Sequence, residues 1–422
     1  MGTVLAPGRR GPLRTRKRVF FWRKDEVEMA EDLRIGVIGC GGRGRLARHA
    51  HKPGEGSRLV AGCDIRPVAL DDFRANYGDD AFVCRDYREL LAQPGIDAVF
   101  VSTPDYWHEE HALAALAAGK HVYLEKPMAI TVPGADRVLT MAREKGVKLY
   151  VGHNMRHMSF VQKMKEVIDR GGIGQVKAGW CRHFVAYGGD AYFKDWHAEQ
   201  SKATSLLLQK GAHDIDILHW LCHGYTKRVI GFGNLSVYNQ ITDRHDPSER
   251  GDASWHLSHW PPLSQKGMNP VIDVEDLSMI TMQLDNEVVC SYQQCHYAPD
   301  GWRNYTIIGT EGRVENFGDV PGHCVVRVWN RRCSYNPYGD EQYFIPEVSG
   351  GHGGADPAIV AEFVRFVRDG GKITTSAVAA RNSVAAGCYA AESLRSGGKP
   401  FDIPPVDPAN QAYFQAWLNG DK

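Results

Sequence analysis

A short apolar run from Ile35 to Ile38 leads into three glycines with the spacing Gly39-x-Gly41-x-x-Gly44, and a helix-compatible stretch follows. A strand, a glycine turn and a helix in this order are what a dinucleotide-binding unit needs, because the turn brings phosphates to the helix N-terminus. A merely structural glycine turn is the alternative. The expected cofactor contacts along the turn are Gly39, Cys40, Gly41, Gly42, Arg43 and Gly44.

A carboxylate stands where the ribose of such a cofactor would lie. The β-like run from Ser57 to Cys63 ends at Asp64, twenty residues after Gly44. A carboxylate there accepts hydrogen bonds from an adenosine ribose and repels a 2′-phosphate, which favours NAD over NADP. Arg66 follows two residues later and could accommodate a phosphate, or it is a solvated residue before a helix.

The composition narrows the class of protein. Lys plus Arg and Asp plus Glu number 50 each in 422 residues, so the charge gives no reason to expect nucleic-acid binding. No run of 18 apolar residues indicates a membrane span. The ten cysteines form no Cys-x-x-Cys pair and are expected to be reduced core residues of a cytoplasmic protein.

Residues 1–30 are basic and contain several Gly and Pro, with no apolar stretch typical of a secretory signal. We expect a disordered leader, or a start codon assigned upstream of Met29.

Residues 31–152 alternate strand and helix patterns, which predicts a doubly wound parallel sheet, a Rossmann domain. The expected strands are 34–39, 59–64, 97–102, 121–125 and 148–151, and the expected helices are 43–51, 68–77, 87–92, 108–118 and 132–144.

Residues 153–422 follow a different pattern, with runs of strands and few helices, which predicts an α+β domain with a mostly antiparallel sheet. The expected strands are 175–185, 229–237, 277–284, 287–297, 305–309, 313–316 and 325–330, and the expected helices are 158–169, 212–222, 358–368 and 376–396. The strands 277–284 and 287–297 alternate apolar and polar residues, so a broad sheet face is expected to be buried in a homodimer or homotetramer.

The polar, Pro-rich segment 238–270 carries three histidines but no Cys or acidic partners at ligand spacing. We expect no metal site there, and interpret the segment as a lid or an interface loop.

Two segments of the first domain end strands at the edge where ligands of doubly wound sheets bind. Glu125-Lys126-Pro127 closes one strand, so Lys126 is expected beside the nicotinamide, where it can hydrogen-bond a substrate hydroxyl; a surface ion pair is the alternative. Thr103-Pro104 closes another, and His108 follows it as a cofactor-lining residue.

A second cluster, Gln209 to Asp216, lies in the other half of the chain. His213 is the expected general base, because its ordinary pKa lies near neutrality. Asp216, one turn later on a helix, could orient it or could be structural. A shared site with Lys126 would have to lie in the cleft between the domains.

Together these motifs resemble the Gfo/Idh/MocA oxidoreductase family over roughly residues 33–404. The resemblance rests on the glycine turn, Thr103-Pro104, Gly119-Lys120-His121-Val122, Glu125-Lys126-Pro127, Gly172-Ile173-Gly174 and His213-Asp214-Ile215-Asp216. It implies a Rossmann domain followed by an α/β domain whose open sheet forms the subunit interface. It also implies that Lys126 and His213 bind the hydroxyl of a carbohydrate-like substrate that NAD(P) oxidises, with Arg156 near the cleft.

The chain departs from the family at one position. Many members carry Asp four residues before the histidine, where this chain has Gln209, followed by Lys210. Gln cannot relay a proton, and Lys210 adds a cation that would suit an acidic or keto substrate. His352, in the glycine-rich stretch 350–356, is a further candidate for the substrate site.

Three functions fit these features. The first is an NAD-dependent dehydrogenase that acts on a secondary hydroxyl of a sugar, inositol or sugar derivative. The second is a glycoside hydrolase that keeps NAD bound, oxidises a hydroxyl transiently, eliminates and reduces again. The third is a non-catalytic cofactor sensor, against which the presence of both Lys126 and His213 argues.

Overall fold

The computed structural model describes residues 1–3, 31–249, 251, 253–255 and 257–420. Almost all of the predicted leader, residues 1–30, lies outside the described residues. From residue 32 to the C-terminus the chain forms one unit. No helix among the described residues has both the length and the apolar character needed to cross a membrane.

The first half builds a six-stranded parallel sheet with the order β3-β2-β1-β4-β5-β6. Its strands are β1 (Leu33–Ile38), β2 (Ser57–Cys63), β3 (Phe82–Cys84), β4 (Ala98–Val101), β5 (His121–Leu124) and β6 (Leu149–Val151). The intervening helices are η1 (Gly42–Ala50), α1 (Pro67–Tyr77), α2 (Tyr87–Leu91), α3 (Asp105–Ala117) and α4 (Val132–Lys145). This confirms the predicted Rossmann sheet; only β3 was not predicted.

Local sequence explains individual helices. Helix α4 starts where the Thr131 hydroxyl accepts a hydrogen bond from Gly134 N at 3.1 Å, and it ends at Gly146, whose φ of +65° is left-handed. The predicted helix after the glycine turn is η1, a 3-10 helix rather than an α-helix. Its first turn is tightened by a bond from Gly44 N to Gly41 O at 2.8 Å.

The second half builds a nine-stranded sheet with the order β14-β13-β12-β11-β7-β10-β9-β8-β15. Only β7 and β10 pair in parallel, so the sheet is mostly antiparallel, as predicted. Its strands are β7 (Val176–Phe184), β8 (Thr226–Asn234), β9 (Leu277–Leu284), β10 (Val289–Cys295), β11 (Trp302–Gly309), β12 (Arg313–Phe317), β13 (Cys324–Trp329), β14 (Glu341–Ile345) and β15 (Phe401–Asp402). Strand β8 begins three residues before the prediction, and β14 and β15 were not predicted.

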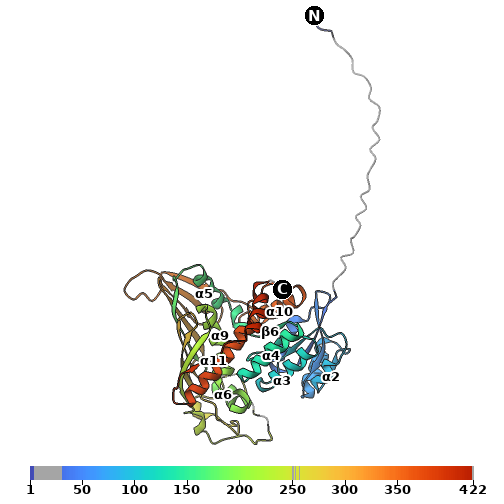
Figure 1. Ribbon diagram of the computed structural model, residues 1–422, viewed down its shortest axis with the longest axis horizontal. Helices are drawn as coiled ribbons and strands as arrows, with labels where there is room; N and C mark the ends of the chain where they lie inside the picture. The colour runs from blue at the N-terminus through green and yellow to red at the C-terminus, as the bar shows by residue number, and fades with distance from the viewer. Residues whose placement is uncertain (4–30, 250, 252, 256, 421–422) are drawn as a thin grey trace. The chain divides into compact units, whose positions relative to one another are not determined.

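The helices after β6 are α5 (Ser159–Asp169), α6 (Gly188–Tyr192), α7 (Gln200–Ala203), α8 (Leu206–Gln209), α9 (Gly211–Cys222), α10 (Ala355–Asp369), α11 (Ala377–Arg395) and α12 (Pro408–Asn419), with short 3-10 turns η2 (Asn154–His157), η3 (Trp196–Ala198), η4 (Tyr238–Gln240) and η5 (Pro262–Ser264). Of these helices, α5, α9 and α11 pack on one face of the nine-stranded sheet, whereas α10 and α12 pack on the Rossmann domain. Figure 1 shows α11 between α9 and α4, and α11 packs against both.

The C-terminal helices return to the first domain. Ile359 and Phe363 of α10 share a buried cluster with Phe100 and Tyr123 of the Rossmann sheet. Residues of α11 and α12 join the core on α4. Residues 355–419 therefore complete the hydrophobic cover of the Rossmann sheet. The predicted domain boundary at residue 152 assigns these residues to the second domain and so misses this packing.

The ten cysteines form no disulfide. Seven are buried, as the composition indicated, whereas Cys333 is exposed and Cys295 and Cys388 are partly exposed.

The other face of the nine-stranded sheet carries exposed apolar side chains. Along β9 the buried residues Ile280 and Met282 face the helices, and Met279 faces outward with 48% of its surface exposed. Phe232, opposite Met279 on β8, is 62% exposed. Contiguous apolar patches on an exposed face are typical of interaction surfaces.

We expect this open face to be buried between copies of the chain. Light scattering at micromolar concentration should give the mass of two or four chains. A Phe232→Lys, Met279→Lys double variant should shift that mass toward one chain, because two buried charges oppose association. The exposed Rossmann change Lys145→Gln is the control, and a monomeric native protein would contradict the prediction.

Candidate active site

The glycine turn has the geometry that the spacing predicts. Gly39 follows β1 with a φ of +85°, and a Cβ there would lie 2.8 Å from the carbonyl oxygen of Ser102. A Cβ at Gly44 would lie 1.7 Å from the carbonyl oxygen of Gly39, so η1 packs directly on the turn. Gly42 has a φ of +49° and open space around it. Only glycine fits at 39 and 44 without moving backbone.

Asp64 lies beside this turn at the end of β2. One carboxylate oxygen accepts from Gly41 N at 3.1 Å, and the other accepts from Arg66 N at 3.0 Å. The flexible end of Arg66 lies over Gly41, where a Cβ would be 1.7 Å from its guanidinium. The turn and the carboxylate therefore fit an NAD-type nucleotide, and Arg66 must swing aside where a pyrophosphate approaches Gly41.

Two other residues of the turn point elsewhere. The buried Cys40 thiol lies 3.3 Å from the Cys63 carbonyl oxygen. The Arg43 side chain binds carboxylates, with Nε 2.8 Å from Glu125 and both Nη atoms on Asp356 of α10 at 2.9 and 3.0 Å. Cys40 and Arg43 can therefore offer a nucleotide their main chain, whereas their side chains hold the turn in place.

Asp356 joins this turn to two further elements. Asn154 of η2 donates to Asp356 at 2.9 Å, and His352 Nδ1 lies 2.9 Å from the same carboxylate. Arg43 and His352 hold the pKa of the Asp356 carboxyl well below its usual range, although burial alone would raise it. His352 has a φ of +51°, an uncommon backbone conformation for a residue with a side chain.

The loops after β4 and β5 are fastened to each other by His108. Its Nδ1 lies 2.6 Å from the Pro127 carbonyl oxygen and its Nε2 lies 2.8 Å from the Thr103 carbonyl oxygen. Pro104 precedes the first residue of α3, and the Thr103 hydroxyl lies 3.0 Å from His111 Nδ1. His108 therefore sets the position of both loops from within the protein.

Lys126 connects the two halves of the chain. It follows β5, and its Nζ donates to the main-chain carbonyl of Gln209 at 2.8 Å. Burial lowers the pKa of Lys126 and raises the pKa of the nearby Asp105 carboxyl. The Gln209 side-chain oxygen is buried and has no hydrogen-bond partner within the described part of the chain.

His213 lies in the first turn of α9, four residues after the Gln209 whose carbonyl Lys126 bonds. Burial lowers the pKa of His213 well below 6.5, and the cations Lys126, Lys210 and Arg303 lower it further. The ring of His153 lies 5.9 Å from that of His213. His213 Nδ1 has no hydrogen-bond partner in the described residues. The imidazole is therefore neutral near pH 7 and able to accept a proton.

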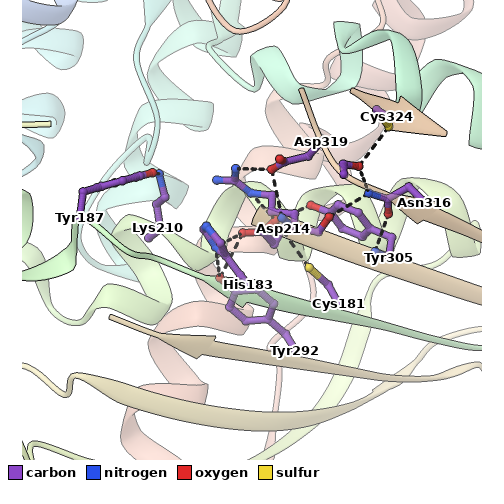
Figure 2. Close-up of polar contacts among 12 residues, drawn as sticks. Cys181, His183, Tyr187, Lys210, Asp214, Tyr292, Tyr305, Asn316, Asp319 and Cys324 are labelled. Carbon is purple, nitrogen blue, oxygen red and sulfur yellow. Dashed lines mark hydrogen bonds and ion pairs between the residues drawn. The ribbon is translucent and has the colours of Figure 1, made fainter. Parts of the chain in front are cut away.

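The residue after His213 anchors this helix to the sheet, as Figure 2 shows. The carboxylate of Asp214 accepts from Arg303 Nε at 2.9 Å, from the Tyr292 hydroxyl at 3.1 Å and from the Tyr305 hydroxyl. His183 Nδ1 of β7 lies 3.0 Å away. Arg303 and His183 hold the pKa of Asp214 well below its usual range, against the effect of burial.

A small cavity of about 80 Å³ opens beside His213. Lys210 lies in its wall, with Nζ 3.3 Å from the Tyr187 hydroxyl. Trp255, from the long segment 238–270, packs edge-on against Tyr187 at a centroid distance of 5.6 Å, so part of that segment lies beside the site. The wall includes Asn154, Tyr187, Lys210, His213, Arg303 and His352.

Arg156 does not line this cavity. Its guanidinium forms two 2.7 Å bonds with Asp216 and donates to the Thr374 carbonyl at 2.8 Å. Asp216 is thereby occupied by Arg156 and has no contact with His213. The sequence-based hypothesis that Asp216 orients His213 is therefore wrong. Both residues lie on α9, but the Asp216 carboxylate is paired with Arg156.

Several residues of the site were not predicted from the sequence. Asp214 lies inside a quoted motif, where a carboxylate in an apolar helix was a usable signal. Arg303 reaches the cavity from β11, Asn154 from η2 and Tyr187 from the residue before α6, and no local pattern distinguishes them. Among the described residues no group of three or more His, Cys, Asp or Glu could hold a metal ion.

Each half of the chain matches a model of a known protein family. Residues 33–153 match the GFO_IDH_MocA model, described as an oxidoreductase family with an NAD-binding Rossmann fold. Residues 165–403 match the model of the C-terminal alpha/beta domain of the same family.

Curated relatives match part of the chain. An inositol 2-dehydrogenase of Ralstonia nicotianae is 35% identical over 45% of this chain and 54% of its own length. A 1-carboxy-3-chloro-3,4-dihydroxycyclohexa-1,5-diene dehydrogenase of Comamonas testosteroni is 32% identical over 46% of this chain and 48% of its own length. The chain thus spans about half the length of these two relatives.

Solved structures share the fold over most of the chain. A levoglucosan dehydrogenase in complex with NADH and levoglucosan has a TM-score of 0.71 at 20% identity, covering 89% of this chain and 100% of that chain. A myo-inositol 2-dehydrogenase from Lactobacillus plantarum has a TM-score of 0.65 at 19% identity, covering 89% of this chain and 100% of that chain.

Asp64 generates a prediction about the cofactor. Replacing it with Ser removes the charge that repels a 2′-phosphate and leaves Arg66 free to bind one, so the ratio of NAD to NADP affinity should fall by about tenfold or more. Titration of protein fluorescence with NADH and NADPH measures both constants. Asp71→Ser, an exposed change on α1, is the control. Tighter binding of NADPH than NADH by the native protein would contradict this role of Asp64.

Proposed function

The chain belongs to the Gfo/Idh/MocA oxidoreductase family, and from this membership we propose that it is an NAD-dependent dehydrogenase that oxidises a secondary hydroxyl of a sugar, inositol or sugar derivative. The observation that carries the proposal is that Lys126, from the Rossmann half, bonds the Gln209 carbonyl of the other half, and that its charge lowers the pKa of His213 four residues later. The relatives act, by their names, on a cyclic polyol and on a carboxylated cyclic diol.

His213 and Lys126 have different roles toward the substrate hydroxyl in this proposal. His213 is neutral because burial and the surrounding cations lower its pKa, so it can accept the proton of a substrate hydroxyl. The Lys126 ammonium, held by the Gln209 carbonyl, can donate to the oxygen of that hydroxyl and stabilise the charge that develops there. NAD, when bound, supplies the hydride acceptor.

The cofactor half and the substrate half are held in a fixed relation by side chains of this protein. Arg43 of the glycine turn binds Asp356 of α10, and Asn154 at the cavity binds the same carboxylate. Positioning of a substrate carbon against a cofactor depends on such links, because small displacements of the reacting atoms cost large factors in rate.

The other two hypotheses have less support. The curated relatives named above are dehydrogenases by name, which favours the first hypothesis. The glycosidase hypothesis requires release of an aglycone without accumulation of NADH. The sensor hypothesis requires cofactor binding without turnover.

Substitution of the two central residues tests the proposal. Lys126→Ala and His213→Ala should each lower kcat by about two to four orders of magnitude, the usual contribution of a positioned acid or base. Affinity for NADH should change little, because the nucleotide is held by the glycine turn. The double variant should lose much less than the product of the two single losses, since groups that act as a unit are not additive.

Steady-state rates of NADH formation over a panel of sugars and inositols, with free aglycone also monitored for glycosides, provide the measurement. Lys145→Ala and His323→Ala, both at exposed positions, are the matched controls. Full activity of His213→Ala would assign the base to Lys126, Lys210 or His352. Full activity of both single variants would exclude the mechanism.

The pH dependence of kcat/KM gives a second test. His213 must be neutral to act, and since its pKa lies below 6.5, the neutral form persists as the pH falls through 6.5 and is lost only at lower pH. Lys126 must be charged to donate, and since its pKa lies below 10.5, the charged form is lost as the pH rises toward that value. We expect a bell whose acid limb lies below 6.5; a limb at or above 6.5 would contradict the assignment of His213.

A further inference from the structure

Two cations from different elements face the cavity beside His213. Lys210 comes from the junction of α8 and α9, and Arg303 comes from β11. The two differ in how their charge is balanced. Arg303 bonds Asp214 at 2.9 Å and lies 3.7 Å from Asp319. Its charge is therefore matched by carboxylates of the protein.

Lys210 lacks such a partner. Among the described residues no carboxylate lies within ion-pair distance of its ammonium, and its one polar contact is the Tyr187 hydroxyl at 3.3 Å. Burial and the nearby Arg303 lower the pKa of Lys210 to about 7, although the more distant carboxylates of Asp214 and Asp319 favour its charged form. A buried ammonium without a counterion is stabilised when an anion binds beside it.

Aromatic rings lie around the Lys210 ammonium but do not balance its charge. Nζ lies 5.6 Å from the ring centres of Tyr187 and Tyr192 and 5.9 Å from that of Trp255. These distances are near the outer limit of cation–π attraction, so the rings contribute little binding but exclude water. A charge-assisted hydrogen bond made in such a surrounding is stronger than one in water.

The cavity favours one kind of anion. Tyr187 accepts a bond from Lys210, which leaves its own hydroxyl proton available to a ligand. The volume of about 80 Å³ admits a small planar group. A planar carboxylate can accept one bond from Lys210 Nζ and one from the Tyr187 hydroxyl, using both of its oxygens.

We propose that the substrate carries a carboxylate, bound by the Lys210 ammonium and the Tyr187 hydroxyl with Arg303 behind them, while the hydroxyl to be oxidised lies at His213. The substrate class is thus a polyhydroxy acid such as a hexuronate. This rests on the dehydrogenase function proposed above. The carbon that bears the hydroxyl loses a hydride to NAD⁺, His213 takes the hydroxyl proton, a ketone forms, and the carboxylate is unchanged.

Matched substrate pairs test the substrate class on the native full-length protein. With NAD, kcat/KM is measured for D-glucuronate against D-glucose, for D-galacturonate against D-galactose, for glucose 6-phosphate and for myo-inositol. The acid of each pair should exceed its neutral counterpart by about 10- to 100-fold, the effect of one charge-assisted hydrogen bond. Thermal stabilisation of the NADH complex by D-glucuronate, without turnover, should follow the same order.

Variants of Lys210 assign the preference to this site. Lys210→Gln should reduce the ratio of acid to neutral kcat/KM toward one, chiefly through KM for the acid, and Lys210→Arg should restore part of it. Lys145→Gln, an exposed lysine of α4, should leave the ratio unchanged. Far-UV circular dichroism of each variant shows whether it is folded, and if Lys210→Gln is not, the comparison of native protein with Lys210→Arg decides.

Each outcome has a separate meaning. Preference of the native protein for the neutral sugars, or an acid preference that survives Lys210→Gln, overturns the carboxylate site and leaves the dehydrogenase function in place. Preference for glucose 6-phosphate over both hexuronates assigns the anion to a phosphate and also overturns it. NAD-dependent oxidation of none of the panel, together with no aglycone release, overturns the proposed function itself.

Discussion

The buried carboxylate of Asp214 is the contact on which the candidate site depends. It lies in the first turn of α9 and accepts hydrogen bonds from Arg303 and Tyr305 of β11 and from Tyr292 of β10. A carboxylate this deep is stable only when it is paired and fully hydrogen-bonded, so the helix has one position on the sheet. Because His213 directly precedes Asp214, the same contacts set where the imidazole points.

A second carboxylate, Asp356, links the two halves of the chain, whereas Asp214 links a helix and a sheet within one half. It binds Arg43 of the glycine turn, Asn154 at the cavity and His352 of the loop before α10. The glycine turn and the cavity wall are therefore linked through one carboxylate. A displacement of the glycine turn would therefore also move Asn154 in the cavity wall, because both are bonded to Asp356.

The charges around His213 bear on the position four residues before it in the chain. Gln209 occupies that position and offers its main-chain carbonyl to Lys126 at 2.8 Å. Burial and the surrounding cations lower the pKa of His213 and keep the ring neutral near pH 7, whereas a carboxylate beside it would raise that pKa. Among the described residues Lys210 has no carboxylate within ion-pair distance, and its ammonium bonds the Tyr187 hydroxyl.

The sequence by itself determined the parallel and antiparallel layers, the glycine turn with Asp64, and the candidates Lys126 and His213, because periodicity and turn chemistry act over a few neighbouring residues. It did not determine that α10 to α12 cover the Rossmann sheet, that Arg156 is taken by Asp216, or that Arg303 and Tyr187 complete the cavity. Those contacts join residues far apart in the chain. They depend on which apolar faces pack together and which buried charges must be paired, and only the tertiary structure decides both.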